Sequence, residues 1–236
     1  MQEKRCMMGI VRELDFSRPF VFLNLKTYKE SQGENAVGLA KIAQKVGEQC
    51  RINMIVIPQA LDLKDVASQV KIPVYSQHAD YSLQEKSTGS IVPESLLHIN
   101  VHGSILNHSE KRLPGKVIEK TVLRLKELDM KSIVCVADNA EAKKIASFKT
   151  VKPDFIAVEP PQLIGGEISI SSAEPKIMEK AVNACKGIPV IAGAGIKSNN
   201  DFKIALSFGC KGVLLSSHYV LSKNPEKFLI ELVKGI

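Results

Sequence analysis

The stretch FIAVEPPQLIGGE, residues 155–167, decides the fold. Its apolar run, 155–158, ends on a carboxylate, Glu159, which is followed at once by two prolines and later by Gly165-Gly166. A short and continuous apolar run is typical of a parallel strand that is buried on both faces. An acid at the end of such a strand indicates chemistry at the carboxyl edge of a sheet.

Seven other segments have the same form. They are PFVFLNLK (19–26), MIVIPQ (54–59), PVYSQHA (73–79), GSILNHS (103–109), SIVCVAD (132–138), PVIAGAG (189–195) and GVLLSSH (212–218). Helical periodicity lies between several of them, at 34–49, 115–128, 201–209 and 225–235. Eight alternating units predict an α/β fold, an eight-stranded parallel (β/α)8 barrel in one domain.

The alternative architecture is a doubly wound open sheet, whose strand order the sequence does not show. No G-x-G-x-x-G follows the first predicted strand, which disfavours the dinucleotide-binding form of that fold. We expect residues 19–236 to form the catalytic barrel and residues 1–18 to form an N-terminal arm with mixed charges.

Composition excludes several classes of function. The formal net charge is +7, but basic residues are scattered among acids, which disfavours a nucleic-acid partner. We find no apolar run of about 18 residues, so no transmembrane helix is predicted. The five cysteines include no C-x-x-C, and His98 and His102 have no third ligand nearby, so we predict reduced thiols and no metal. The expected compartment is the cytoplasm.

Polar residues stand at the predicted carboxyl ends of the strands, where barrels of this kind place their active sites. Among these polar residues, Lys26, His108 and Glu159 are the titratable side chains that suit acid–base catalysis. A carboxylate can remove a proton from carbon, an imidazole can polarise the carbonyl oxygen, and an ammonium can stabilise an enediolate. Taken singly, each residue has an ordinary structural explanation, but together they favour a site.

Glycine and serine follow the last two predicted strands, at Gly193-Ala194-Gly195 and at Ser216-Ser217. Small residues let backbone N–H groups approach a phosphate closely, and barrels that bind phosphate usually do so here. His78, at the end of the third strand, is expected to lie behind the site. The polar loop after it, 80–90, is a candidate contact between subunits.

Five segments carry a resemblance to a known family. They are NLKTY (24–28), LNHSEKR (106–112), VEPPQLIGG (158–166), GAGI (193–196) and LLSS (214–217). In this order and spacing the chain resembles triosephosphate isomerases of the short archaeal type, over nearly all of its length from Pro19. The resemblance implies interconversion of dihydroxyacetone phosphate and D-glyceraldehyde 3-phosphate, without a cofactor, in glycolysis and gluconeogenesis. It also implies a homo-oligomer, either a dimer or a tetramer.

The resemblance also assigns roles to residues. Glu159 would be the base, His108 the electrophile, Lys26 the third catalytic group and Glu110 a carboxylate supporting Lys26. In this family the histidine electrophile is neutral. The substrate would be bound by Asn24, Leu25, Lys26, Ile164, Gly165, Gly195, Ser216 and Ser217.

The segment after Glu159 is predicted to be a lid. Two prolines would stiffen its near hinge, and Gly165-Gly166 would free the far one. The chain departs from the family pattern at Gly166-Glu167 and at His218. The two alternative functions are a sugar-phosphate epimerase and an inactive binding scaffold. Such epimerases commonly need metal ligands or paired acids at other strand ends, and that set is not seen here. The presence of Lys26, His108 and Glu159 disfavours the scaffold.

Overall fold

The computed structural model describes residues 14–160, 176–185 and 187–236. Its strands form one eight-stranded sheet in the order β2-β1-β8-β7-β6-β5-β4-β3, and every pairing is parallel. The strands are β1 (Phe20–Asn24), β2 (Asn53–Ile57), β3 (Tyr75–Ser76), β4 (Gly103–Leu106), β5 (Lys131–Val136), β6 (Phe155–Val158), β7 (Val190–Ala192) and β8 (Gly212–Leu215). All eight predicted strands are present, and the barrel prediction is confirmed.

The ring closes between β2 and β3, the first and last strands in that order. The closure is slight, because β3 has two residues and the two strands meet through one parallel bridge, Val56 to Val74. The backbone N–H of Val56 also donates to the carbonyl oxygen of Pro73 at 3.2 Å. The sheet is therefore a nearly closed barrel with a weak seam.

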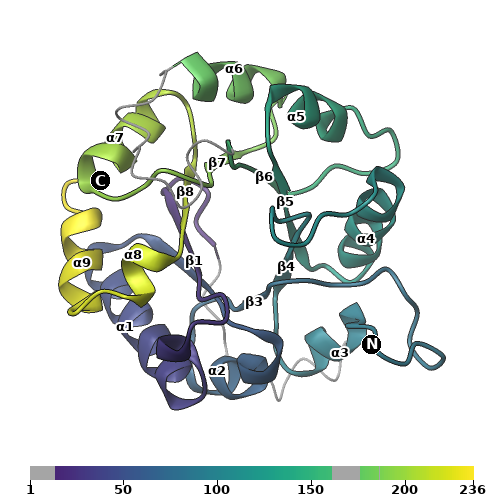
Figure 1. Cartoon of the computed structure of the whole chain (residues 1–236), viewed down its shortest axis with the longest axis horizontal. Helices are drawn as coiled ribbons and strands as arrows, with labels where there is room; N and C mark the ends of the chain where they lie inside the picture. Colours follow the sequence, from purple (N-terminus) through teal and green to yellow (C-terminus); the bar gives the residue numbers. More distant parts are fainter. Residues whose placement is uncertain (1–13, 161–175, 186) are drawn as a thin grey trace.

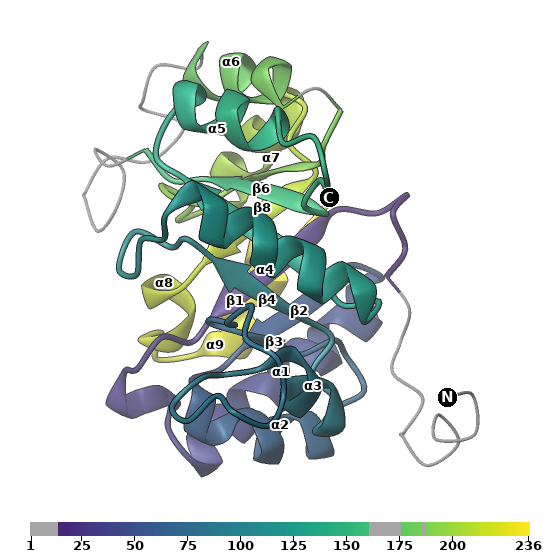
Figure 2. The same cartoon turned by 90° about the vertical axis from the view of Figure 1, so that its right-hand side faces the viewer.

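Helices surround the sheet, as Figure 1 shows from one end. They are α1 (Glu34–Cys50), α2 (Leu63–Gln69), α3 (Pro93–His98), α4 (Gly115–Glu127), α5 (Asn139–Ala146), α6 (Lys176–Ala184), α7 (Asn199–Ser207), α8 (Ser217–Val220) and α9 (Pro225–Leu232), with short 3₁₀ turns η2 (Lys29–Ser31) and η3 (Ala60–Asp62). Seen from the side, α4 and α5 lie along the outside of the strands (Figure 2). No described helix combines the length and apolar character needed to cross a membrane.

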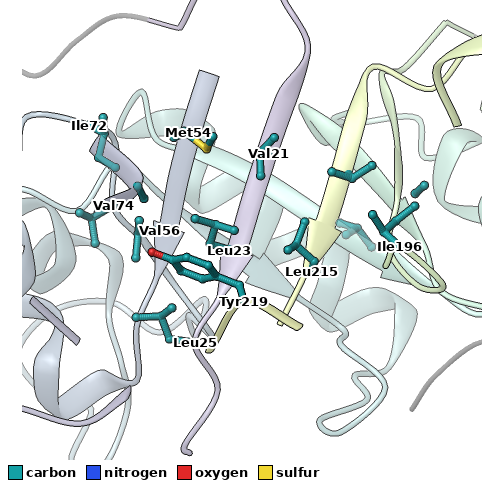
Figure 3. Close-up of a cluster of buried hydrophobic side chains, with 14 of the residues drawn as sticks. Val21, Leu23, Leu25, Met54, Val56, Ile72, Val74, Ile196, Leu215 and Tyr219 are labelled. Atoms are coloured by element: carbon teal, nitrogen blue, oxygen red, sulfur yellow. The ribbon is translucent and has the colours of Figure 1, made fainter. Parts of the chain in front are cut away.

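Alternation along each strand divides the core into two layers. On β1, Val21 and Leu23 face the helices, and with Leu25 and Tyr219 of α8 they form part of the outer layer (Figure 3). The inner layer fills the barrel. Its members are Phe20, Phe22, Ile55, Ile57, Tyr75, Ile105, Ile133, Cys135, Phe155, Ala157, Ile191 and Leu214. The first inward-facing position beyond the last of these residues on a strand lies at the carboxyl rim of the barrel. The alternation of inward and outward side chains therefore determines which residues reach the site.

The amino end of the barrel is covered by residues just before β1. The ring of Phe16 stacks on that of Phe155, with centroids 5.9 Å apart, and meets Phe20 edge to face. Leu14 packs against the same inner layer. Part of the predicted N-terminal arm therefore closes the barrel from below, while residues 1–13 lie outside the described residues.

Candidate active site

Two polar residues reach the rim by continuing the inward parity of their strands. Asn24 follows Phe22 on β1, and Glu159 follows Ala157 after β6. Both are buried, at 5% and 4% exposure. They line a cavity of about 300 Å³ at the carboxyl end of the barrel. The cavity is lined by Asn24, Lys26, Tyr28, His108, Ser109, Glu110, Glu159, Gly193, Ala194, Gly195, Ile196, Lys197, Leu214, Leu215, Ser216, Ser217 and His218.

The pKa of the Glu159 carboxyl group suits a general base. Burial raises the pKa of Glu159 to about 7, although the Ser109 backbone, the Cys135 thiol and the Lys26 ammonium oppose that rise. Its Oε2 atom is buried and has no hydrogen-bond partner among the described residues. Because a base works best with a pKa near the working pH, this carboxylate suits proton abstraction.

The tight fit of Glu159 depends on a glycine. A Cβ atom on Gly193, which follows β7, would lie 2.6 Å from Cγ of Glu159 and 3.1 Å from the carbonyl oxygen of Val158. The backbone N–H of Gly193 donates to that same oxygen at 2.8 Å. The first glycine of the loop therefore makes room for the carboxylate, a role that the sequence did not reveal.

His108 faces Glu159 with a defined tautomer. Its Nε2 lies 3.4 Å from Glu159 Oε1, while its Nδ1 accepts a hydrogen bond of 3.2 Å from the backbone N–H of Glu110. Burial lowers the pKa of His108 below its usual value; Glu110 opposes this, and Lys26 and Arg112 add to it. A neutral ring whose Nδ1 accepts must carry its proton on Nε2, the atom that faces the cavity.

Lys26 is fixed in place by both its backbone and its ammonium group. Its φ of 47° is left-handed, and its N–H donates to Asn24 Oδ1 at 3.0 Å. Its Nζ lies 2.7 Å from Glu110 Oε1. Gln77, after β3, donates its side-chain amide to Asn24 Oδ1 at 3.2 Å and to the Lys26 carbonyl oxygen at 3.0 Å. Gln77 was missed from sequence, although it precedes the His78 that was singled out.

The loops after β7 and β8 form the other wall of the cavity. Gly195 has a φ of 75°, which glycine adopts without strain. The hydroxyl oxygen of Ser216 is buried with no partner among the described residues, and Ser217 begins α8 beside it. Lys197 and His218 line the same wall, and burial lowers the pKa of His218. This wall combines small residues with donors that suit an anion.

A second cavity, of about 320 Å³, adjoins the first beyond Lys26 and His108. His78 lines it, 9% exposed, with Nε2 3.1 Å from Asp80 Oδ1. Burial lowers the pKa of His78 despite that contact. His78 therefore lies behind the first cavity and not in it.

Three predicted site residues are absent from the described lining of the cavity. Leu25 is fully buried in the outer core layer, so its side chain faces the helices (Figure 3). Ile164, Gly165 and the rest of the predicted lid lie outside the described residues. Within the described part of the chain, no group of three or more His, Cys, Asp or Glu side chains is placed to hold a metal ion.

Known proteins match this chain over almost all of its length. The family model described as triosephosphate isomerase matches residues 19–234. The triosephosphate isomerase of Methanothermus fervidus is 45% identical over 92% of this chain and 98% of its own. That of Methanobrevibacter smithii is 41% identical over 92% and 99%, and that of Archaeoglobus fulgidus is 40% identical over 90% and 96%. The chain therefore belongs to the triosephosphate isomerase family.

Proposed function

We propose that this protein interconverts dihydroxyacetone phosphate and D-glyceraldehyde 3-phosphate, with Glu159 as base and His108 as electrophile. The observation that carries the assignment of roles is the facing pair of Glu159 Oε1 and His108 Nε2, 3.4 Å apart. The carboxylate has its pKa raised to about 7, and the imidazole has its pKa lowered. One group can thus accept a proton while the other donates a hydrogen bond.

The proposed reaction moves one proton between two neighbouring carbons. Glu159 removes a proton from the carbon beside the carbonyl group, and the electron pair left behind forms the double bond of an enediolate. As the carbonyl oxygen gains negative charge, the Nε2–H of His108 protonates it, and the ring then takes the proton of the neighbouring hydroxyl group. A second proton thus moves between the two oxygens, while the Lys26 ammonium stabilises the negative charge of the enediolate. Glu159 then returns the proton to the other carbon, so that the enzyme ends as it began.

The phosphate of the substrate is proposed to lie against the far wall. Backbone N–H groups around Gly195, Ser216 and Ser217 would bind it, and the unpartnered Ser216 hydroxyl supports this placement. Ile164 and Gly165 remain proposed contacts on the basis of sequence. Lys26 and Asn24 would bind the opposite end of the triose, where Glu110 and Gln77 hold them.

The test is isomerisation by the purified protein in D2O, followed by proton NMR. Starting from glyceraldehyde 3-phosphate, we expect dihydroxyacetone phosphate and deuterium incorporation at the carbon next to the carbonyl group. An epimerase would instead return an epimer of a longer sugar phosphate and leave the triose unchanged. A chain that binds phosphate but exchanges no deuterium would be an inactive scaffold, and the proposal would fail.

We also propose a homo-oligomer that contacts its copies through the 80–90 loop. Support comes from apolar side chains exposed on that loop: Leu83 is 66% exposed and Tyr81 42%. Light scattering after size exclusion should give a dimer or a larger assembly, and Leu83→Glu should lower the mass. A wild-type monomer at micromolar concentration would reject this proposal.

A further inference from the structure

The segment between β4 and α4, residues 107–113, brings three groups to Glu159 and Lys26. His108 contributes its ring, Ser109 its backbone N–H, and Glu110 the carboxylate that pairs with Lys26. None of these groups lies on a strand, so the precision of the site depends on what holds this segment. Misplacement by about 1 Å can cost about 100-fold in rate.

The segment is tied down at its beginning by Asn107. This residue has a φ of 60°, a left-handed conformation that turns the chain sharply before His108. Its side-chain amide donates to the carbonyl oxygen of Cys135 at 2.8 Å and to Glu141 Oε1 at 3.1 Å. Its Oδ1 accepts from the backbone N–H of Leu113 at 2.9 Å, which joins the two ends of the segment.

Arg112 ties down the other end and meets the same carboxylate. Its Nη1 donates to the carbonyl oxygen of Asn107 at 3.2 Å, and its Nη2 pairs with Glu141 Oε1. Glu141 Oε2 accepts from the backbone N–H of Ala137 at 2.8 Å, just after β5. Both Glu141 oxygens are therefore used, one toward the segment and one toward β5.

Glu141 itself is fixed by its own helix. Its backbone N–H donates to the side chain of Asp138, the N-cap of α5, at 2.8 Å. The pKa of Glu141 is held below its usual value: burial would raise it, but hydrogen bonds from Arg112, Ala137 and Asn107 outweigh burial. The carboxylate is thus ionised at neutral pH, and it joins the start of α5 to the segment that carries His108.

We propose that Glu141 is a positioning residue for catalysis, which holds the 107–113 segment so that His108 and Ser109 face Glu159. The proposal rests on the proposed function, since Glu159 and His108 are the reacting groups there. Glu141 lines neither of the two cavities. It acts through Asn107 and Arg112.

Glu141→Gln tests the proposal because an amide has only one oxygen. If that oxygen accepts from Asn107 and Arg112, the NH2 group faces the Ala137 N–H, and two donors oppose each other. If it accepts from Ala137, the hydrogen bonds from Asn107 and Arg112 that hold the segment are lost. We expect kcat to fall by about 10- to 100-fold with KM changed less than about threefold. We also expect the acid limb of the pH profile, which is the rise of kcat/KM on its acidic side, to move to higher pH. The reason is that the Ser109 N–H would no longer lower the pKa of Glu159.

Other charged and titratable groups also face Glu159. They are Lys26, Glu110, Cys135, His108 and, at longer range, Arg112. Glu110, His108 and Arg112 belong to the 107–113 segment and would move with it, whereas Lys26 and Cys135 lie outside it. Apart from burial, the pKa of Glu159 is shifted by Ser109, Cys135, Lys26 and Glu110, and Glu141 itself is not one of these groups. A movement of the acid limb would therefore report the position of the segment and not the loss of the Glu141 charge alone. Arg112→Lys, which keeps the charge but loses the fork, should move the limb in the same direction.

Asp154→Asn is the matched control at the opposite end of β5. Asp154 also accepts from a backbone N–H, that of Ser132 at 3.0 Å, and pairs with a cation, Lys131, at 3.0 Å. Its side chain is 27% exposed, close to the 23% of Glu141. This variant should lower the melting temperature about as much as Glu141→Gln but leave kcat and the pH profile unchanged.

Nitrogen-15 NMR of the histidine rings gives a readout that does not need turnover. In Glu141→Gln and in Arg112→Lys, the Nδ1 resonance of His108 should shift as its bond from Glu110 N–H weakens. If both variants keep wild-type kcat, pH profile and Nδ1 shift, Glu141 is only structural and the proposal is overturned. If the wild type does not isomerise triose phosphate, the proposed function fails, and the NMR shift still decides whether Glu141 positions His108.

Discussion

His108 Nε2 lies 3.4 Å from Glu159 Oε1, and each group has its pKa moved toward the form that the other requires. Burial keeps the imidazole neutral, so its Nε2 carries a proton toward the cavity. Burial also raises the pKa of the carboxyl to about 7, which makes it a stronger base than an exposed glutamate. The same removal from water prepares both partners.

The first prediction concerns the pH dependence of the rate. Because Glu159 must be ionised to accept a proton, kcat/KM should rise with pH and level off above about 7, the pKa of the free enzyme. The measurement is kcat/KM between pH 5 and 9 at constant ionic strength, corrected for the ionisation of the substrate phosphate. A midpoint near the ordinary glutamate value would contradict the account of burial.

The second prediction concerns Glu159→Gln. Removing the base should lower kcat by about 10²- to 10⁴-fold. The variant should, however, be more stable than the wild type at high pH. A carboxyl group whose pKa is higher in the folded than in the unfolded state makes the wild-type protein less stable as pH rises from about 4.5 to about 7. The variant should therefore match the wild type near pH 4.5 and be more stable at pH 8, by a few kcal/mol at most. Denaturant unfolding at both pH values provides the check.

The third prediction concerns Lys26→Met, which keeps most of the apolar part of the side chain and removes its charge. We expect both a higher KM and a lower kcat, because one ammonium would serve the bound substrate and the enediolate alike. Lys45→Met is a suitable control, since Lys45 forms a comparable pair with Glu226 at 2.6 Å, away from the cavity. If the two variants differ only in melting temperature, Lys26 has no catalytic role.

The fourth prediction concerns Gly193→Ala. The new methyl group would lie 2.6 Å from Glu159 Cγ, so the base must move or the loop must shift. We expect a loss of about 1–3 kcal/mol in stability and a fall in kcat. Gly38→Ala in α1 is the control, because its Cβ meets nothing within 4 Å and alanine favours a helix. That control should be slightly stabilised and fully active.

The fifth prediction concerns the proposed lid, residues 161–165, on sequence grounds alone. A shorter link containing glycine should leave the barrel folded and slow isomerisation. It should also raise the ratio of methylglyoxal and inorganic phosphate to isomerised product, since an enediolate phosphate exposed to water can expel its phosphate. The ratio is measured at one pH for the variant and the wild type. Equal ratios would make the segment a mere connector.

The sequence predicted much of the fold because strands buried on both faces leave a plain apolar record. It predicted Glu159 and Asn24 because a polar residue ending such a run must reach the rim. Gln77, Gly193 and Glu141 could not be found this way, because their roles depend on which loops meet across the barrel. The left-handed turn at Asn107 could not be predicted either. Asparagine adopts a positive φ more often than most residues, but here it directly follows an apolar run and is read as the end of that strand.

The seam between β2 and β3 is where this barrel can open most easily. Seven joints are laddered strand pairs, while the eighth is one bridge between Val56 and Val74. Gln77 spans that gap as a staple, since its amide donates to the Ile57 carbonyl oxygen of β2 at 3.3 Å and to the Lys26 carbonyl oxygen beyond β1. Any widening of the seam would pull first on the backbone that presents Lys26. Opening of the seam would therefore displace the backbone of Lys26 along with that of Ile57.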